Sequence, residues 1–151
     1  MLSADNGTLI FNPVLYKSLS YNPGKDLTPV TLMGRFPMIL VAGPAEKAKT
    51  AKEFIAAAKA SAEGVNYGSA GAGTTHHLAG ELFKILTKTN IQHVPYRGAG
   101  PAMQDLIAGH VPVVFDGMGS SAGPIRAGQL RALAVAAPKR VAAFPDLPTA
   151  A

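Results

Sequence analysis

The sequence contains no cysteine and no tryptophan, and only 7% of its residues are aromatic. The lack of cysteine excludes a disulfide scaffold, a thiolate metal site and a cysteine nucleophile. No apolar run reaches the ~18–20 residues of a membrane-spanning helix, and the first residues, MLSADNGTLI, lack the features of an export signal. What is present is an apolar composition: 48% of the 151 residues are hydrophobic and 15% are charged. This composition argues against disorder and predicts one ordinary folded domain.

Positive charge is present but is not concentrated anywhere in the chain. The net charge is +5, yet the 14 lysines and arginines are scattered, and only Lys139 and Arg140 are adjacent. A nucleic-acid binder usually gathers such residues on one element, with aromatic residues between them. The pattern therefore argues against nucleic acid as a partner. It suits small anionic ligands, which a mild positive field attracts.

The chain has two regions with different patterns. Up to about Met33 it is rich in turn residues, whereas from Phe36 onward short apolar segments alternate with amphipathic ones. The apolar segments, which predict strands, are residues 37–41, 65–67, 91–94, 111–115 and 130–135. Helices are expected from Thr50, from Thr75, from Pro101 and near residues 124–127. The alternation predicts an α/β fold with a mainly parallel sheet.

The predicted connections from strand to helix are rich in glycine at residues 68–75, 96–100 and 116–121. In a parallel sheet all such loops leave the carboxyl edge of the strands, so we expect them to share one rim, where α/β proteins bind ligands. In the first loop, Gly71 and Gly73 permit close backbone approach, and unpaired amides at the following helix start can bind an anion. A helix cap without any ligand would explain the same residues. No Gly-Lys-Ser/Thr sequence follows, which argues against nucleotide binding.

The adjacent histidines His76 and His77 raise the question of a metal site. Neighbouring residues on a helix point about 100° apart, so the two cannot chelate one ion together. His77 and Glu81 have a suitable spacing but lack further ligands. Packing or capping is the better interpretation of these histidines, and of His93 in its strand. No metal or other cofactor is expected.

A G-x-S-x-G sequence around Ser121 gives an alternative hypothesis, a serine hydrolase with a nucleophile elbow. That fold places an acid and then a histidine after the serine, and no histidine follows Ser121. We therefore expect the protein not to be an enzyme. Asp116, at the end of an apolar strand, could cap the next turn or pair with a ligand. Arg97 could clamp a carboxylate.

Several motifs occur in an order that resembles one known family. They are NPVLY at 12–16, YNPGKD at 21–26, NYGSAGAGTTHHLAGELF at 66–83, HVPYRGAGPA at 93–102, FD at 115–116, GQLRALAV at 128–135 and FPDLPT at 144–149. The set resembles the Bug/TctC family, the extracytoplasmic solute-binding proteins of tripartite tricarboxylate transporters. The resemblance covers nearly the whole chain.

This resemblance implies a periplasmic-binding-protein-like (type II) fold, with one three-layer α/β domain and partial segments of a second domain. It implies capture of a small carboxylate (a di- or tricarboxylate, an aromatic acid or an acidic amino acid) in the periplasm, and its delivery to membrane permease subunits. Family members are about twice as long, so the chain is expected to be a fragment that lacks a signal peptide and a first half-domain, and to bind weakly. Residues 1–35 would be the tail of the first domain, 36–136 the second domain and 137–151 the return crossing.

Carried over residue by residue, the family pattern also implies a set of ligand contacts. These are Ser69, Ala70, Gly71, Thr74 and Thr75 in the first loop, Gly98, Ala99, Gly100, Pro101 and Ala102 in the second, and Asp116 in the third. A contact from Asn6, Gly7 and Thr8 is a further possibility. Apolar residues of the first-domain segments should be exposed and invite a homodimer or a domain swap: Leu9, Ile10, Phe11, Val30, Leu32 and Phe144.

Overall fold

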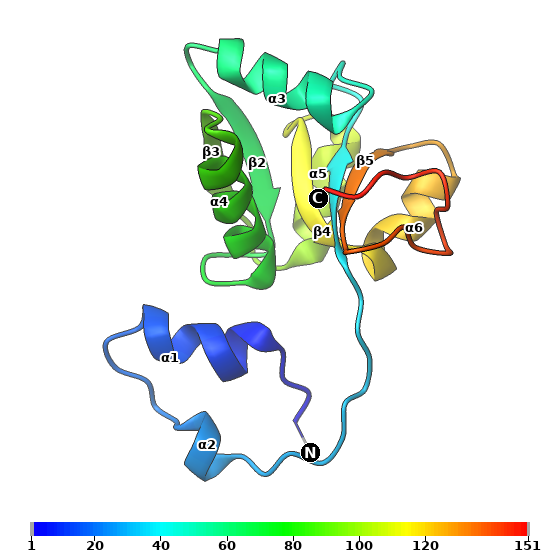
Figure 1. Cartoon of the computed structure of the whole chain (residues 1–151). Coiled ribbons are helices and arrows are strands. Elements are labelled where there is room, and N and C mark those ends of the chain that lie inside the picture. Colours follow the sequence, from blue (N-terminus) through cyan, green and yellow to red (C-terminus); the bar gives the residue numbers. More distant parts are fainter. Residues whose placement is uncertain (1, 151) are drawn as a thin grey trace.

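The computed structural model describes residues 2–150, which form an N-terminal segment and an α/β domain (Figure 1). The N-terminal segment contains the π-helical turn η1 (Gly7–Phe11) and the helices α1 (Asn12–Leu15) and α2 (Pro23–Asp26). The α/β domain contains β1 (Met38–Ala42), α3 (Ala51–Ala60), β2 (Val65–Ser69), α4 (Thr75–Thr87), β3 (Ile91–Pro95), α5 (Ala99–Ala108), β4 (Val113–Gly117), α6 (Met118–Arg126) and β5 (Arg131–Ala136). Within residues 2–150, no helix combines the length and the apolar character needed to cross a membrane.

The strands form one sheet in the order β3-β2-β4-β1-β5. β2 pairs in parallel with β3 and β4, whereas β1 is antiparallel to both β4 and β5. Four strands therefore share one direction, and the predicted mainly parallel sheet is confirmed. β1 is the exception because it enters the sheet beside the end of β4, where Met38 pairs with Gly117. A short apolar pattern predicts a strand but carries no information on its direction.

Helices cover both faces of the sheet, so the domain has three layers. On one face, α3 and α4 pack Phe54, Ala58 and Phe83 against Tyr67 and Phe115 of the sheet. On the other face, α5 contributes Met103 and Leu106, α6 contributes Ile125, and they cover Ile39, Val41 and Val135. Alternate side chains of β1, β4 and β5 thus reach two separate apolar cores, as expected for strands with both faces covered.

The structure corrects the loop expected at residues 116–121. β4 extends to Gly117, and α6 begins at the next residue, Met118, so this stretch is mostly helical. The carboxylate of Asp116 accepts hydrogen bonds from the hydroxyl groups of Ser120 and Ser121, which ties the first turn of α6 to the end of β4. The expected helix near 124–127 is only the last part of α6. Glycine-rich composition predicted a loop here, but these local hydrogen bonds stabilise a helix.

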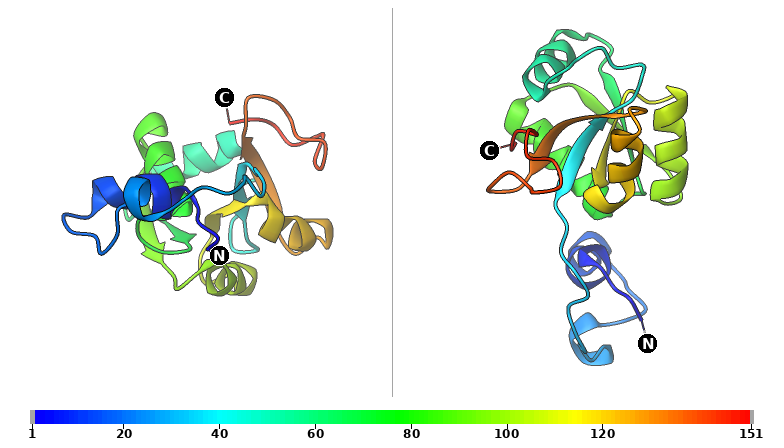
Figure 2. Two further views of the ribbon diagram at one scale, coloured as in Figure 1. Left: turned by 90° about the horizontal axis from the view of Figure 1, so that it is seen from below. Right: turned by 90° about the vertical axis from the view of Figure 1, so that its right-hand side faces the viewer.

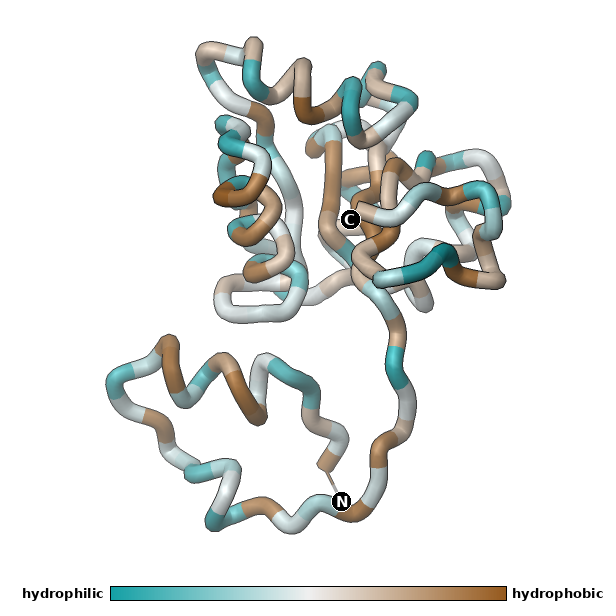
Figure 3. The backbone as a smooth tube through the Cα atoms, viewed as in Figure 1, coloured by the Kyte–Doolittle hydropathy of each residue, from teal (hydrophilic) through white to brown (hydrophobic). Residues whose placement is uncertain are grey.

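The N-terminal segment lies beneath the α/β domain in Figure 1, on the side of β2 and α4, and a linker without helix or strand, residues 27–37, joins the two. The right-hand view in Figure 2 shows the same separation. Within the segment, the Tyr21 hydroxyl donates to the carbonyl oxygen of Thr8 at 2.8 Å, and the Asn12 side-chain amide donates to Tyr21 at 3.2 Å. Hydrophobic residues occur along this segment and the linker (Figure 3). Leu9, Ile10, Val30 and Leu32 are exposed, as predicted.

The predicted exposure of Phe144 and Phe11 is wrong, because both are half-buried. Phe144 packs against the core beneath α5 and α6, and the guanidinium carbon of Arg126 lies 5.4 Å from its ring centre. The chain around it folds back onto β5, where the amide of Val135 donates to the Pro148 carbonyl at 2.9 Å. Leu147 is buried in the same core. Residues 141–150 therefore cover one face of this domain.

Candidate functional site

The carboxyl ends of β2, β3 and β4 lie at one edge of the sheet, since the three strands are parallel neighbours. Ser69 pairs with Pro95 at the ends of β2 and β3, and the Gly98 amide donates to the Ala70 carbonyl at 3.1 Å. The first and second predicted loops are therefore in direct contact. Asp116, near the end of β4, completes a rim shared by the three predicted regions. This rim is the candidate functional site.

Two glycines give the first loop its shape. Gly71 has φ of +131° and Gly73 has φ of +77°, values that side chains rarely permit. Thr74 is the N-cap of α4: its hydroxyl oxygen accepts from the His77 amide at 3.3 Å and donates to the Gly71 carbonyl at 2.6 Å. The cap interpretation of this loop is thus correct. It does not exclude a ligand, because a cap uses only part of the amides at a helix start.

The loop amides fall into two groups. Those of Gly71, Gly73, Thr74 and Gly98 donate to acceptors within the protein. Those of Ala72, Thr75, His76, Ala99 and Gly100 have no acceptor within the described residues 2–150. All five of the latter belong to the rim: Thr75 and His76 lie at the start of α4, Ala99 and Gly100 at the start of α5, and Ala72 in the loop before α4. Unpaired amides at helix starts attract anions, because they combine hydrogen bonds with the positive end of the helix dipole.

The remaining predicted residues take different places around these amides. Ser69 and Ala102 are buried beneath the loops, Thr74 and Thr75 are half-buried, and Pro101 is exposed. Arg97, also on the second loop, is exposed and makes no ion pair within the described part of the chain. Its cationic group is therefore available to a carboxylate.

Asp116 lies below the rim and is only 1% exposed. One carboxylate oxygen lies 3.1 Å from Nε2 of His76, and the other accepts from Ser120 and Ser121. Burial alone would raise the pKa of Asp116, but the hydrogen bonds from His76, Ser120 and Ser121 outweigh it and lower the pKa below its ordinary value. The group is thus a buried, hydrogen-bonded anion that caps the next turn. A direct ligand contact by Asp116 stays a prediction.

Two histidines under the first loop hold it in place, which agrees with the packing or capping that the sequence predicted for them. His77 Nδ1 accepts from the Gly73 amide at 3.1 Å, and His93 Nε2 lies 2.6 Å from the Ser69 hydroxyl oxygen. Their rings stack with centroids 4.0 Å apart and planes 24° from parallel. One signal was present in the sequence: Thr74-x-x-His77 places a histidine where a capping box has Glu or Gln.

The rim does not have the arrangement of a serine hydrolase. Ser121 lies within α6, is fully buried and donates its hydroxyl proton to Asp116, not to a histidine. A nucleophile must instead be exposed and activated by a base. Among residues 2–150 there is also no group of three or more His, Cys, Asp or Glu side chains placed to hold a metal ion.

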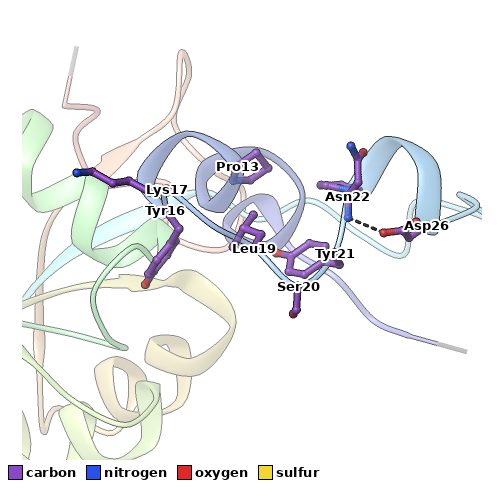
Figure 4. Close-up of a pocket in the computed structure, with 9 residues that line it drawn as sticks. Pro13, Tyr16, Lys17, Leu19, Ser20, Tyr21, Asn22 and Asp26 are labelled. Atoms are coloured by element: carbon purple, nitrogen blue, oxygen red, sulfur yellow. Dashed lines mark hydrogen bonds between the residues drawn. The ribbon is translucent and has the colours of Figure 1, made fainter.

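The N-terminal segment lies close to the first loop at Gly73. A Cβ built at Gly7 would lie 3.6 Å from the Gly73 carbonyl oxygen, and one built at Gly73 would lie 3.4 Å from Leu15 and 3.7 Å from the Tyr16 hydroxyl. A separate open hollow of about 530 Å³ lies within the N-terminal segment itself (Figure 4). Its lining residues all belong to 13–26 and include none of the rim, so we do not assign it to the site.

Comparison with known proteins finds a match over almost the entire chain. The model of the tripartite tricarboxylate transporter family receptor (TctC) matches residues 2–151. Among curated proteins, Protein BugT of Bordetella pertussis is 36% identical over 151 residues, which are 100% of this chain and 46% of BugT.

Solved structures give the same result. One described as a periplasmic transporter has a TM-score of 0.92 and 41% identity, and the match covers 97% of this chain and 49% of that one. MatC from Rhodopseudomonas palustris with bound malate has a TM-score of 0.87 and 33% identity, over 95% of this chain and 49% of MatC. An R. palustris protein solved with adipate has a TM-score of 0.86 and 34% identity, over 89% of this chain and 45% of that one. The chain thus spans about half the length of the proteins it matches.

Proposed function

Because this chain belongs to the tripartite tricarboxylate transporter receptor family, we propose that its rim forms one wall of a binding site for a small carboxylate, which it captures without chemical change. The observation that carries this proposal is the set of unpaired amides of Ala72, Thr75, His76, Ala99 and Gly100 at one edge of the sheet. Two relatives that share the fold were solved with malate and with adipate, both dicarboxylates. The same chemistry would suit tricarboxylates, aromatic acids and acidic amino acids.

The free energies involved favour weak binding by this chain. A hydrogen bond to a charged group contributes about 1.5–3 kcal/mol, and a helix start adds about 0.3–1 kcal/mol. Ordering the ligand and removing its water offsets part of this gain. Millimolar affinity needs about 4 kcal/mol and micromolar affinity about 8 kcal/mol. A few such hydrogen bonds on one wall therefore give affinity near the millimolar range.

The full contact set remains that implied by the family pattern. It comprises Ser69, Ala70, Gly71, Thr74, Thr75, the residues Gly98 to Ala102 and Asp116, with a further contact from Asn6, Gly7 and Thr8 of the N-terminal segment. For Ser69, Ala102 and Asp116, which are buried, we propose that they act mainly by holding the loops. The approach of Gly7 to Gly73 supports an added contact from the N-terminal segment beside this wall. We also propose that residues 1–35 are the tail of a first domain, residues 36–136 the second domain and residues 137–151 the return crossing.

A nuclear magnetic resonance titration tests this function. Malate and adipate should shift the amide signals of Thr75, His76 and Ala99 in a saturable way, and the neutral diamide of malic acid should not, since it lacks the negative charges. Sub-micromolar binding would contradict the single-wall account. Absence of any shift at tens of millimolar ligand, or shifts confined to residues away from the rim, would contradict carboxylate binding at this site.

The transporter role and the assembly of the chain belong to the same proposal. We propose that the loaded protein delivers its ligand to membrane permease subunits on the periplasmic side, because the matching family is that of transporter receptors. Exposed Leu9, Ile10, Val30 and Leu32 would allow copies of the chain to pair or to swap their N-terminal segments. Light scattering that gives a monomer mass at high concentration would contradict the pairing.

A further inference from the structure

The stacked histidines beneath the first loop contact the loop in two places. Nδ1 of His77 accepts from the Gly73 amide at 3.1 Å. Nε2 of His93 lies 2.6 Å from Oγ of Ser69, which in turn accepts from the Gly71 amide at 3.0 Å. The two glycines with positive φ are thus each held by a histidine, one directly and one through a serine. The unpaired amides of Thr75 and His76 follow immediately in the chain.

The contact to Gly73 specifies the protonation state of His77. A ring nitrogen that accepts from an N–H group must carry a lone pair, so Nδ1 is unprotonated and the ring is neutral with its proton on Nε2. A protonated imidazole carries N–H groups at both nitrogens and has no acceptor left. Proton uptake by His77 would place two N–H groups against each other and remove the bond to Gly73.

The contact to Ser69 does not impose the same requirement on His93. The Ser69 oxygen can accept from a protonated Nε2 and direct its own proton to the Gly71 carbonyl, 3.2 Å away. The stacking nevertheless couples the rings, since two positive charges at 4.0 Å repel each other. Burial first, and then the charge of His77, lower the pKa of His93 below its ordinary value of 6.5, with Glu81 opposing them.

The other titratable groups around the pair come from β2 and α4. The Tyr67 ring lies 5.2 Å from that of His93, and the Tyr67 hydroxyl donates to Glu81 at 2.7 Å. Lys84 lies 4.0 Å from the other Glu81 oxygen. His76, the next residue on α4, is bonded to Asp116. Glu81 is thus shared with a tyrosine and a lysine, and its attraction for a charged His77 is correspondingly reduced.

We propose that His77 and His93 are positioning residues of the proposed binding site, which hold the 69–74 loop in its anion-binding shape only while His77 is uncharged. Proton uptake by His77 releases Gly73, and carboxylate binding weakens. This inference rests on the proposed function. It predicts that acidification lowers the affinity for a carboxylate. Simple attraction predicts the opposite, because a positively charged histidine near the rim would strengthen the binding of an anion.

The test compares two variants of His77 across pH. In the His77→Asn variant, the side-chain oxygen can take the place of Nδ1 as an acceptor but does not titrate. In the His77→Ala variant the acceptor is lost. Malate affinity of the unmodified chain should fall by up to about five-fold on acidification from pH 7.5, the effect of losing about one hydrogen bond. The Asn variant should show no such fall, and the Ala variant should bind weakly at every pH.

A second readout keeps this inference separate from the proposed function. In the ligand-free protein, the Gly73 amide signal should shift with pH together with the ring signals of His77, and should not shift with pH in His77→Asn. If these signals titrate but malate never binds, the proposed function fails. If malate binds and its affinity is constant or rises on acidification, or if His77→Ala binds as the unmodified chain does, the positioning role of His77 is overturned. The His93→Gln variant, which keeps a polar group near Ser69, should retain most of the affinity at pH 7.5.

Discussion

The hydroxyl group of Ser121 donates a hydrogen bond to the buried carboxylate of Asp116. This contact joins the first turn of α6 to the end of β4, beside His76 from the start of α4. The serine that a hydrolase motif would make a nucleophile is therefore a structural donor. The aspartate connects three elements of the rim, which makes it important for stability whether or not it contacts a ligand.

Replacing Asp116 should lower stability and change its pH dependence. Asp116→Asn loses the charge and one acceptor oxygen of a buried network, and we expect a loss of about 1–3 kcal/mol at pH 7. The pKa of Asp116 is held below its ordinary 3.8, so the folded state binds fewer protons than the unfolded state in acid. Its contribution is present above pH 3.8 and is lost as pH falls through the lower folded value.

Denaturant unfolding from pH 7 to pH 2 measures this effect. The loss of stability in acid should be smaller in Asp116→Asn than in the unmodified chain. Asp146→Asn, at an exposed aspartate, is the matched control and should change little. Equal stability of the two variants at pH 7 would show that the hydrogen bonds around Asp116 add nothing to the free energy of unfolding.

Ser121→Ala distinguishes the binding protein from the alternative hydrolase. We expect no hydrolysis of activated esters above background by either the unmodified chain or the variant, because Ser121 is buried and bonded to a carboxylate. The variant should instead lose about 1.5–3 kcal/mol of stability, because it removes a hydrogen bond to a buried carboxylate. Ester cleavage that disappears in Ser121→Ala would overturn this interpretation.

The packing of α4 on the sheet depends on the small size of Gly80. A Cβ added there would clash with the ring of Tyr67, which is fully buried. Gly80→Ala should destabilise the domain by about 1–3 kcal/mol or more, because the core must shift to admit the methyl group. Gly119→Ala in α6 is the control, since among the described residues no heavy atom beyond its chain neighbours and its own helix backbone lies within 4 Å of such a Cβ. It should be neutral or stabilising by up to about 1 kcal/mol, and thermal unfolding that ranks the two variants the other way would contradict this packing.

The sequence predicted the layers and the shared rim, because both depend on regular patterns. Alternation of apolar strands with amphipathic helices predicts parallel neighbours, and parallel neighbours bring the loops after β2, β3 and β4 to one edge. The direction of β1 could not be predicted in this way. It depends on which sheet position β1 occupies, and the five apolar residues Met38–Ala42 fit either direction.

The details of the site depend on contacts between distant residues, which local patterns do not contain. Whether a loop amide is free was decided by side chains such as Ser69 and His77, which bind the amides of Gly71 and Gly73. The stacking of His77 on His93 requires β3 to lie beside β2, which no local pattern fixes. The burial of Phe144 likewise followed from residues 141–150 folding back onto β5.

The central claim is that backbone amides at the start of α4 hold the carboxylate, and Thr75→Pro tests it most directly. Thr75 is the first residue of α4, where proline is tolerated, and Thr74 before it has φ −76° and ψ 162°, which suit a residue preceding proline. The substitution removes the Thr75 amide hydrogen but keeps the helix, and Thr75→Ala is the control that removes only the hydroxyl group. The measurement is malate affinity at pH 7.5. We predict binding weaker by about ten-fold or more in Thr75→Pro than in Thr75→Ala, and equal affinity in the two variants with α4 intact would contradict the claim.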